Sequence, residues 1–318
     1  MRIVAAIGGN ALLERGEKPD AGIQLHHVQQ AARSLAPLAR HHELIICHGN
    51  GPQVGLLAME SANDASLSRP YPLDVLGAQT QGMIGYWLAQ SLRNEGVAKP
   101  VVAVVTQVVV DGSDPGFDAP TKFVGSGYTQ LEANRLADLR GWTIARDGQQ
   151  WRRVVASPEP VRVVELDTIS GLLESQAVVI CGGGGGAPVV DDGPDGLHGV
   201  EAVVDKDLTA AMLAITLRAD RLILLTDVAA VMRNFGTAQA EPLHRLSLDV
   251  LDGMSFAAGS MGPKIEACRR FVEATRRPAA VGALSDAMSI VGGTAGTTVV
   301  AGHSLQPEGA HDAVVINR

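Results

Sequence analysis

The chain opens with MRIVAAIGGNAL at residues 1–12, where an apolar run of strand length ends directly in two glycines. The same junction recurs in LIICHGNGPQVG at residues 44–55 and in AVVICGGGGGAP at residues 177–188. Glycine at a strand end lets backbone N–H groups approach an anion at the start of the next helix. In an open parallel sheet, such loops share the carboxyl edge, where ligands bind. Each junction alone is only a turn signal, but the three together predict an α/β fold with an anion-binding edge.

Apolar runs of strand length continue along the chain. They lie at residues 101–110, 222–225, 279–284 and 297–301. Continuous apolar character indicates strands that are covered on both faces. Helical patterns separate several of these runs, at residues 24–40, 78–94, 209–219 and 263–275. This β-α-β alternation predicts a three-layer αβα sandwich built on a mostly parallel open sheet.

Residues 111–160 break this alternation. They contain the loop-forming sequences DGSDPG, APTK and SPEP, together with two of the three tryptophans. We therefore expect a small protruding lid subdomain here, carried by an N-terminal lobe of residues 1–200. A glycine-rich stretch at residues 182–199 leads into a C-terminal lobe of residues 201–318.

The composition favours a globular protein that acts on a small molecule. The 318 residues carry a formal net charge of −8, and no run of Lys and Arg resembles a footprint for nucleic acid or an anionic membrane. No apolar stretch reaches the roughly 18 residues of a membrane span, and the first apolar run is too short for a secretory signal. Cys47, Cys181 and Cys268 are too widely spaced for a zinc site or a disulfide framework. We expect reduced thiols, a cytoplasmic location and no metal held by the protein itself.

Three lysines stand beside unusual neighbours. Lys122 lies in the lid, Lys206 lies between Asp205 and Asp207, and Lys264 follows a glycine-rich segment ahead of a helical pattern. Phosphoryl transfer needs positive charge around the transferred group, and a neighbouring carboxylate keeps such lysines protonated before the substrate binds. Two other interpretations stay open: Lys206 and Lys264 as exposed residues at helix starts, and Asp205 as a helix N-cap. A cation at a helix N-terminus opposes the helix dipole, so the placement of the lysines needs a reason.

The familiar phosphate-binding motifs do not occur in the chain. It contains neither GxxxxGK[S/T] nor GxGxxG ahead of a helix. A phosphate group would therefore be held in another way, by the glycine loops and the lysines. Asp227, at the end of the apolar run 222–225, either touches nucleotide or begins a turn.

Further motifs make the chain resemble the carbamate kinases, from GGNA at residues 8–11 to about Val300. The most specific segments are QGMIGYW (81–87), TQVVVD (106–111), PTK (120–122), WRRVV (151–155), SPEP (157–160), DKD (205–207) and GSM (259–261). The resemblance implies the amino acid kinase fold and a reversible, Mg²⁺-dependent phosphoryl transfer between ATP and carbamate that yields ADP and carbamoyl phosphate. It also implies a homodimer and a place in arginine metabolism.

The same resemblance assigns roles to individual residues. Asn10 stands where many relatives of this fold place a catalytic lysine, and Lys122 would reach in from the lid to substitute for it. Lys206 and Lys264 would contact the ATP phosphates, and Asp207 would organise the lysines. Carbamate or carbamoyl phosphate would bind in the N-terminal lobe, and nucleotide over the C-terminal lobe. The implied substrate-binding residues are Gly8, Gly9, Asn10, Gly49, Asn50 and Gly51, and the implied nucleotide-binding residues are Lys206, Asp227, Val228, Asn234, Phe235, Gly236, Met261 and Lys264.

The chain departs from the family pattern in three places. Phe123 replaces a frequent proline, Ser126-Gly127 replaces a more hydrophobic pair, and residues 303–318 run beyond the usual end. One alternative is a kinase of the same fold that acts on another small carboxylate or phosphate, although Asn10 and the PTK segment argue against it. The other is a nucleotide-binding regulatory protein without turnover, which the presence of all three lysines and of Asp207 disfavours.

Overall fold

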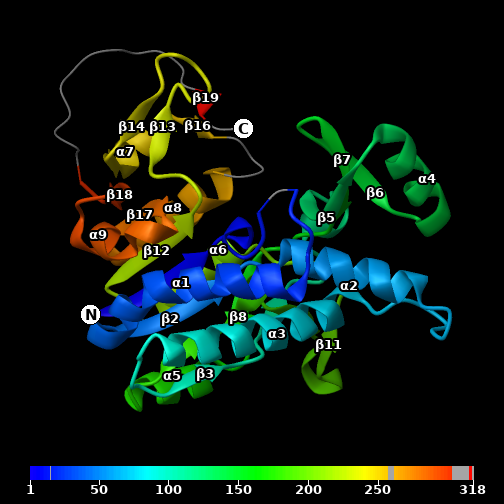
Figure 1. Ribbon diagram of the computed structural model, residues 1–318, viewed down its shortest axis with the longest axis horizontal. Coiled ribbons are helices and arrows are strands. Elements are labelled where there is room, and N and C mark those ends of the chain that lie inside the picture. Colours follow the sequence, from blue (N-terminus) through cyan, green and yellow to red (C-terminus); the bar gives the residue numbers. More distant parts are fainter. Residues whose placement is uncertain (15, 257–260, 303–314, 317–318) are drawn as a thin grey trace.

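Eight strands form one large sheet at the centre of the molecule (Figure 1). The computed structural model describes residues 1–14, 16–256, 261–302 and 315–316. In spatial order the strands run β15-β18-β17-β12-β1-β2-β9-β3. Their bounds are β1 (Arg2–Ile7), β2 (Glu43–His48), β3 (Val101–Ala103), β9 (Val178–Ile180), β12 (Arg221–Thr226), β15 (Arg245–Ser247), β17 (Ala279–Ala283) and β18 (Thr297–Val300).

The large sheet is mostly parallel. β1 pairs in parallel with β2 and β12, and β9, β3 and β17 continue in the same direction. Among the described pairings of this sheet, only β17 with β18 is antiparallel, so β15, which is parallel to β18, also runs against the rest. The carboxyl ends of β12, β1, β2 and β9 therefore meet at one edge. The predicted mostly parallel open sheet is confirmed.

Helices cover both faces of this sheet, because successive side chains of each strand point into two different cores. On one face, Ile3, Ala5 and Ile7 of β1 pack with α1, α3 and α9. On the other face, Val4 and Ala6 of β1 pack with α5, α6 and α8. The predicted three-layer αβα sandwich is thus also confirmed. The helix bounds are α1 (Ala21–His41), α3 (Leu73–Asn94), α5 (Leu166–Glu174), α6 (Lys206–Thr216), α8 (Met261–Thr275) and α9 (Ala287–Gly292).

The apolar run at residues 101–110 is not one strand, contrary to our expectation. It forms β3 in the large sheet and β4 in a second sheet, whose order is β11-β10-β4-β8. The break falls at Thr106, whose N–H donates to Gln81 Oε1 (2.8 Å) and whose carbonyl accepts from Gln81 Nε2 (3.1 Å). A buried side chain thus engages the backbone where the chain passes from one sheet to the other. The bounds of the second sheet are β4 (Gln107–Val110), β8 (Pro160–Val163), β10 (Ala187–Asp191) and β11 (Leu197–Gly199).

Between β4 and β8 the chain builds a projection of its own (Figure 1). Strands β5 (Lys122–Tyr128), β6 (Thr143–Asp147) and β7 (Gln150–Val155) form a three-stranded antiparallel sheet beside α4 (Gln130–Arg140). Helix α4 begins with a capping box between Thr129 and Glu132 and ends at Gly141, which takes a left-handed φ of 66°. We refer to residues 111–160, which contain this small sheet, as the lid.

Shorter elements complete the fold. Helix α2 (Gly51–Asn63) follows β2 directly, and α7 (Leu248–Leu251) follows β15. A hairpin of β13 (Val231–Arg233) and β14 (Glu241–Leu243) rises beyond β12, and β16 (Ser255–Phe256) pairs with β19 (Val315–Ile316). The 3-10 turns are η1 (Gly9–Ala11), η2 (Pro115–Phe117), η3 (Gly183–Gly185), η4 (Gly193–Asp195) and η5 (Leu284–Asp286).

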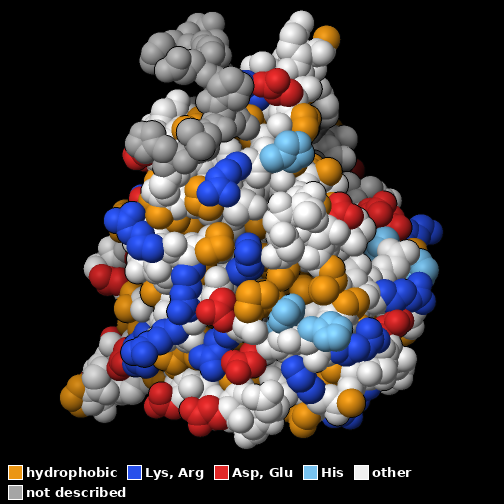
Figure 2. Space-filling view, turned by 90° about the vertical axis from the view of Figure 1, so that its left-hand side faces the viewer, with side chains coloured by type: hydrophobic (Ala, Val, Ile, Leu, Met, Phe, Trp, Pro, Cys, Tyr) orange, Lys and Arg blue, Asp and Glu red, His pale blue; other side chains and the backbone are white. Residues whose placement is uncertain are grey.

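The molecular surface carries charged side chains of both signs. Figure 2 shows basic, acidic and histidine side chains interspersed on the face that lies at the left of Figure 1. That face therefore does not present the continuous basic stripe of a nucleic-acid footprint. Among the helices that the structure describes, none is long and apolar enough to cross a membrane.

Candidate functional site

The first two glycine loops touch each other at the carboxyl edge of the large sheet. Gly8 follows β1 and Gly49 follows β2, and these strands are neighbours. A Cβ atom added at Gly49 would lie only 2.6 Å from the backbone nitrogen of Gly9, so no side chain fits there. Helix α2 begins at Gly51, immediately after this contact. The predicted substrate-binding backbone is thus assembled in one place, while the side chain of Asn10 lies outside the described part of the structure.

The third glycine loop, residues 182–186 after β9, closes on the second. A Cβ atom at Gly184 would lie 2.0 Å from Asn50 Nδ2, and one at Gly183 would lie 2.3 Å from His48 Nε2. Gly184 has a φ of +65°, which favours glycine independently of space. Asn50 is buried, and its Nδ2 donates to Thr80 Oγ1 at 2.8 Å. The sequence marked this loop as a junction, but our predicted site residues did not include it.

The amino end of α6 brings two aspartates and a lysine to the same edge. Asp205 caps the helix, since its Oδ1 accepts from the backbone N–H of Asp207 at 2.8 Å. This confirms the capping role considered for Asp205. Lys206 Nζ donates to Asp207 Oδ1 at 2.5 Å. The third glycine loop packs here as well, because a Cβ atom at Gly185 would meet the carbonyl oxygen of Val204 at 2.2 Å.

Lys264 reaches the same carboxylate from the first turn of α8. Its Nζ lies 3.1 Å from Asp207 Oδ2, so one aspartate holds two lysines that lie 58 positions apart in sequence. The side chains of Lys206, Asp207 and Lys264 are 12%, 5% and 14% exposed. The interpretation of the two lysines as ordinary exposed helix-start residues is therefore wrong. Burial beside a shared carboxylate instead indicates a charged site.

Lys122 enters this cluster from the lid. Its Nζ donates to Asp205 Oδ2, the carboxylate oxygen that does not cap α6. Asp205 therefore caps α6 and also holds a lysine, two roles that the sequence allowed together, although it did not indicate Lys122 as the partner. We refer to Lys122, Asp205, Lys206, Asp207 and Lys264 as the lysine–aspartate cluster.

The lysine–aspartate cluster holds three cationic and two anionic side chains. Burial acts to raise the pKa of Asp207, but Lys206 and Lys264 outweigh it and hold that pKa well below its usual range. At Lys264 burial is outweighed by Asp207, and the pKa is raised. At Lys206 burial, together with the charge of Lys264, outweighs Asp207, and the pKa is lowered. Within the cluster three lysines face two carboxylates, so an incoming anion would balance the third positive charge.

The residues predicted to bind nucleotide divide into two groups. Asp227 follows β12 and lies close enough to Lys264 to raise the pKa of that lysine, and Met261 begins α8 and is buried. These residues share the corner of the lysine–aspartate cluster, and Val228 packs against the adjoining core. The turn of Asn234, Phe235 and Gly236 follows β13, and none of the described hydrogen bonds or ion pairs of the cluster reaches it.

His48 is a buried residue of this edge that sequence reasoning missed. It ends β2, and its Nδ1 lies 2.9 Å from the carbonyl oxygen of Gly49. Burial lowers the pKa of His48 to about 4, against the effect of this bond and aided by the charge of Lys206. The ring is therefore neutral at neutral pH, and Nδ1 carries the proton because a carbonyl only accepts. The sequence signal that could have indicated His48 is its position at the end of an apolar strand, directly before a glycine loop.

We expect His48 to make the protein less stable as the pH falls from 6.5 towards 4. Its pKa is about 4 when folded and 6.5 in the reference state, so in this window the unfolded chain binds a proton that the folded chain does not. The expected loss is on the order of 3 kcal/mol in the free energy of unfolding. Urea unfolding at several pH values should show a flatter profile for His48→Gln than for the unchanged protein. The exposed His41→Gln is the control, and equal acid sensitivity of all three proteins would contradict the prediction.

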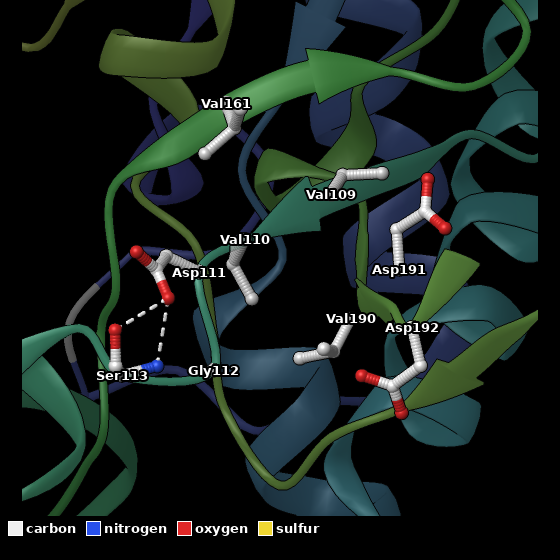
Figure 3. Close-up of a pocket in the computed structure, with 9 residues that line it drawn as sticks. All are labelled: Val109, Val110, Asp111, Gly112, Ser113, Val161, Val190, Asp191 and Asp192. Carbon is white, nitrogen blue, oxygen red and sulfur yellow. Dashed lines mark hydrogen bonds between the residues drawn. The ribbon is translucent and has the colours of Figure 1, made fainter. Parts of the chain in front are cut away.

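A separate pocket of about 490 Å³ lies between the ends of β4, β8 and β10 (Figure 3). Val110 and Val190 lie between Asp111 on one side and the carboxylates of Asp191 and Asp192 on the other. Each carboxylate already has a partner: Asp111 accepts from Ser113, Asp191 from Arg162, and Asp192 pairs with His198 at 3.1 Å. The acidic lining repels phosphate. This pocket therefore does not compete with the lysine–aspartate cluster as an anion site.

The described residues contain no obvious site for a resident metal ion. No group of three or more His, Cys, Asp and Glu side chains is arranged among them to hold one. Two acidic side chains of this edge, Asp205 and Asp207, are engaged by lysines. A metal ion used here would therefore have to arrive with a ligand that supplies oxygen atoms of its own.

Comparison with known proteins relates most of the chain to one family of kinases. The amino acid kinase family model matches residues 1–282. A carbamate kinase of Rhizobium meliloti (strain 1021) is 50% identical over 305 residues, which cover 94% of this chain and 93% of that protein. A carbamate kinase of Haemophilus influenzae is 47% identical over 300 residues, with 94% and 96% covered. The structure of carbamate kinase from Giardia lamblia bound to AMP-PNP has a TM-score of 0.84 and 36% identity, over 94% of this chain and 98% of that one.

Proposed function

Because this chain belongs to the amino acid kinase family, and within it to the carbamate kinases, we propose that it transfers a phosphoryl group reversibly between ATP and carbamate. The products in that direction are ADP and carbamoyl phosphate. The observation that carries the proposal is the lysine–aspartate cluster, in which three lysines face two carboxylates beside three glycine loops. Such a site is short of negative charge until a phosphate group enters it.

Each part of the site has a task in an in-line transfer. A carbamate oxygen attacks the γ-phosphorus, and no general base is needed because the nucleophile is already an anion. The loops of Gly8, Gly9, Gly49 and Gly51, with Asn10 and Asn50, hold the carbamate and the transferring group. Gly9 and Gly51 would present their backbone N–H groups to it, whereas those of Gly8 and Gly49 already donate to the carbonyl oxygens of Leu225 and Ile7. Lys122 neutralises the phosphoryl oxygens from the lid side, while Lys206 and Lys264 neutralise them and the bridge to ADP from the other side. Asp207 orients these two lysines.

Nucleotide would lie over the C-terminal lobe, residues 201–318, and carbamate in the N-terminal lobe, residues 1–200. The position of Asp227 and Met261 beside Lys264 supports this for one part of the nucleotide. Val228 and the turn of Asn234, Phe235 and Gly236 complete the proposed nucleotide site. The exposed ring of Phe235 offers a surface on which a base could stack.

Several finer features of the proposal rest on the family alone. Mg²⁺ would come with the nucleotide and offset the charge of its phosphate groups, in keeping with the engaged state of Asp205 and Asp207. A homodimer, a cytoplasmic location and a place in arginine metabolism are typical expectations for the family. The substrates are small molecules, and the mixed charge of the face in Figure 2 gives no support to nucleic acid as a partner.

The direct test is ATP formation from ADP and carbamoyl phosphate with Mg²⁺, using the purified full chain. We expect rapid ATP formation, which Lys206→Ala abolishes or nearly abolishes. Lys99→Ala is the matched control, because Lys99 lies outside the cluster and donates to the carbonyl oxygen of His42. Acetyl phosphate in place of carbamoyl phosphate should give slower turnover.

Two outcomes would redirect the proposal. Faster turnover of another acyl phosphate would make the protein a kinase of a different small carboxylate. Tight ADP binding without turnover of any acyl phosphate would favour a regulatory nucleotide-binding protein. Neither alternative has a specific structural observation in its favour, since all three lysines and Asp207 meet in one site.

A further inference from the structure

The lid rests on helix α2 through a contact between two glycines. Gly55 lies in the second turn of α2, and Gly125 lies in the lid strand β5. A Cβ atom added at Gly55 would come within 2.0 Å of Gly125 Cα and 2.5 Å of its backbone nitrogen. Backbone therefore meets backbone here, at a separation that no other residue at position 55 allows. Figure 1 shows β5 above α2 at the base of the lid.

The lid side of this contact is held in place from within the lid. Gly125 has a left-handed φ of +71°, and its carbonyl oxygen accepts two hydrogen bonds from Arg152, at 3.1 Å from Nε and 2.8 Å from Nη2. Arg152 also pairs with Asp147 at 2.9 Å and lies over the ring of Phe123 at 5.5 Å. Phe123, one of the departures from the family pattern, thus packs against the arginine that fixes Gly125.

A second contact joins the lid to α2 farther from the site. Arg140, at the end of α4, donates to Asn63 Oδ1 at 2.7 Å and approaches Met59 Sδ at 3.1 Å. Asn63 is the last residue of α2, whereas Gly55 lies one turn from the glycine loop at its start. The lid therefore contacts α2 from Gly55 to Asn63, and the contact between the two glycines lies at the end nearer the site.

We propose that Gly55 and Gly125 are positioning residues for Lys122. Lys122 begins β5, three residues before Gly125, so the separation of the two glycines determines how far the lysine extends over the site. With the glycines in contact, Lys122 Nζ reaches Asp205 in the lysine–aspartate cluster. The inference rests on the proposed function, because it concerns the position of the lysine that would neutralise the transferring phosphoryl group.

The geometry indicates how large the effect of one methyl group should be. Non-bonded carbon atoms rest at about 3.5–4.0 Å, so alanine at position 55 would push β5 away by more than about 1 Å. A displacement of about 1 Å in a reacting geometry can cost about 10²-fold in rate. The nucleotide side of the site comes from α6 and α8, which do not carry this contact.

The test is steady-state ATP formation from ADP and carbamoyl phosphate by Gly55→Ala. We expect kcat to fall about 10²-fold, with the KM for ADP changed by less than about twofold. Gly82→Ala is the matched control, because Gly82 also lies inside a helix but has open space where a Cβ would go, and we expect no change in rate. If the unchanged protein itself makes no ATP, the proposed function fails. If it is active and Gly55→Ala is equally active, only this inference fails.

A double-mutant cycle separates positioning of Lys122 from general damage. If Gly55 acts through Lys122, adding Gly55→Ala to Lys122→Ala should lower kcat no further. A multiplied loss in the double variant would overturn the inference. If Gly55→Ala does not fold, Gly125→Ala takes its place. The Cβ atom of that alanine would lie 3.4 Å from Gly55 Cα, so we expect a smaller loss of kcat. This loss should also disappear in the Lys122→Ala background. A full loss that persists there would equally overturn it.

Discussion

Replacement of Lys122 by alanine is expected to lower kcat for ATP formation by about 10²–10³-fold, the range found when one donor to a developing negative charge is removed. Lys122 is the lid's contribution to the lysine–aspartate cluster, and its side chain is 33% exposed, so it is free to leave Asp205 for an incoming phosphoryl oxygen. The two remaining lysines are held by Asp207 on the other side of the site and cannot replace it. The loss should therefore fall on the transferring step.

The kinetic pattern distinguishes this role from ordinary binding. The KM for ADP should change little, because Lys206 and Lys264 remain, whereas a group that binds substrate and transition state equally would raise KM without lowering kcat. Initial rates over a matrix of ADP and carbamoyl phosphate concentrations give both constants. Lys99→Ala again provides a lysine deletion outside the site. Near-full kcat in Lys122→Ala would remove the lid from the mechanism.

Asp205 offers an independent check on the same step. It caps α6 with one carboxylate oxygen and accepts from Lys122 with the other. Asp205→Asn keeps an oxygen that can cap the helix, since asparagine is as good an N-cap as aspartate. Loss of its charge should free Lys122 without unfolding α6. The variant should therefore retain more activity than Lys122→Ala, and thermal unfolding should show a small change.

The strand and glycine pattern predicted much of the fold because each signal is local. The apolar runs at residues 3–7, 44–47, 177–181 and 222–225 form the cores of β1, β2, β9 and β12, and each is followed within two residues by glycine or aspartate. Burial on both faces leaves little choice of structure for such segments. The run at residues 101–110 has the same character but divides between two sheets. Its break depends on Gln81, 25 positions away, which bonds to the backbone of Thr106. The local pattern could not predict the break between β3 and β4, because it depends on a side chain that is distant in sequence.

In the candidate site, too, local features could be predicted and contacts between distant residues could not. Capping of α6 by Asp205 could be predicted, because a cap and its helix are adjacent in sequence. Its contact with Lys122 spans 83 positions and depends on how the lid sits on α2. The convergence of Lys206 and Lys264 on Asp207 was expected only through a family resemblance. The contact between Gly55 and Gly125 could not be predicted, because the sequence shows only two glycines among many.

Asp207→Ala should be the most destabilising single change in the site. It would leave Lys206 and Lys264, whose side chains are 12% and 14% exposed, buried without the carboxylate they share. Removing one partner of a buried ion pair costs about 3–5 kcal/mol, because the remaining charge is left uncompensated. We expect a loss of that size in the free energy of unfolding, measured by urea denaturation at neutral pH, together with loss of ATP formation. Asp111→Ala, at an exposed carboxylate, is the control and should change stability far less.

Two further measurements tie this loss to charge. A nucleotide phosphate brings negative charge to the two lysines, so a saturating amount of ADP should raise the unfolding midpoint of Asp207→Ala at least as much as that of the unchanged protein. An Asp207→Ala variant that is as stable as the unchanged protein would mean that the lysines do not depend on this carboxylate. A variant that ADP cannot stabilise at all would mean that Asp207 does more than balance them.

The pH dependence of the free energy of unfolding should show how much stability depends on the ionised carboxylate of Asp207. The two lysines hold the pKa of Asp207 well below its usual range, so its contribution to stability is complete above the ordinary aspartate pKa of about 4 and disappears as the pH falls below that value. Asp207→Asn should therefore lack this acid-sensitive part below about pH 4 but keep the loss between pH 6.5 and about 4 that belongs to His48. If Asp207→Asn removes only the loss of stability below about pH 4, and His48→Gln removes only the loss between pH 6.5 and about 4, each titration is assigned to its residue. Identical profiles would show that neither buried group controls acid stability.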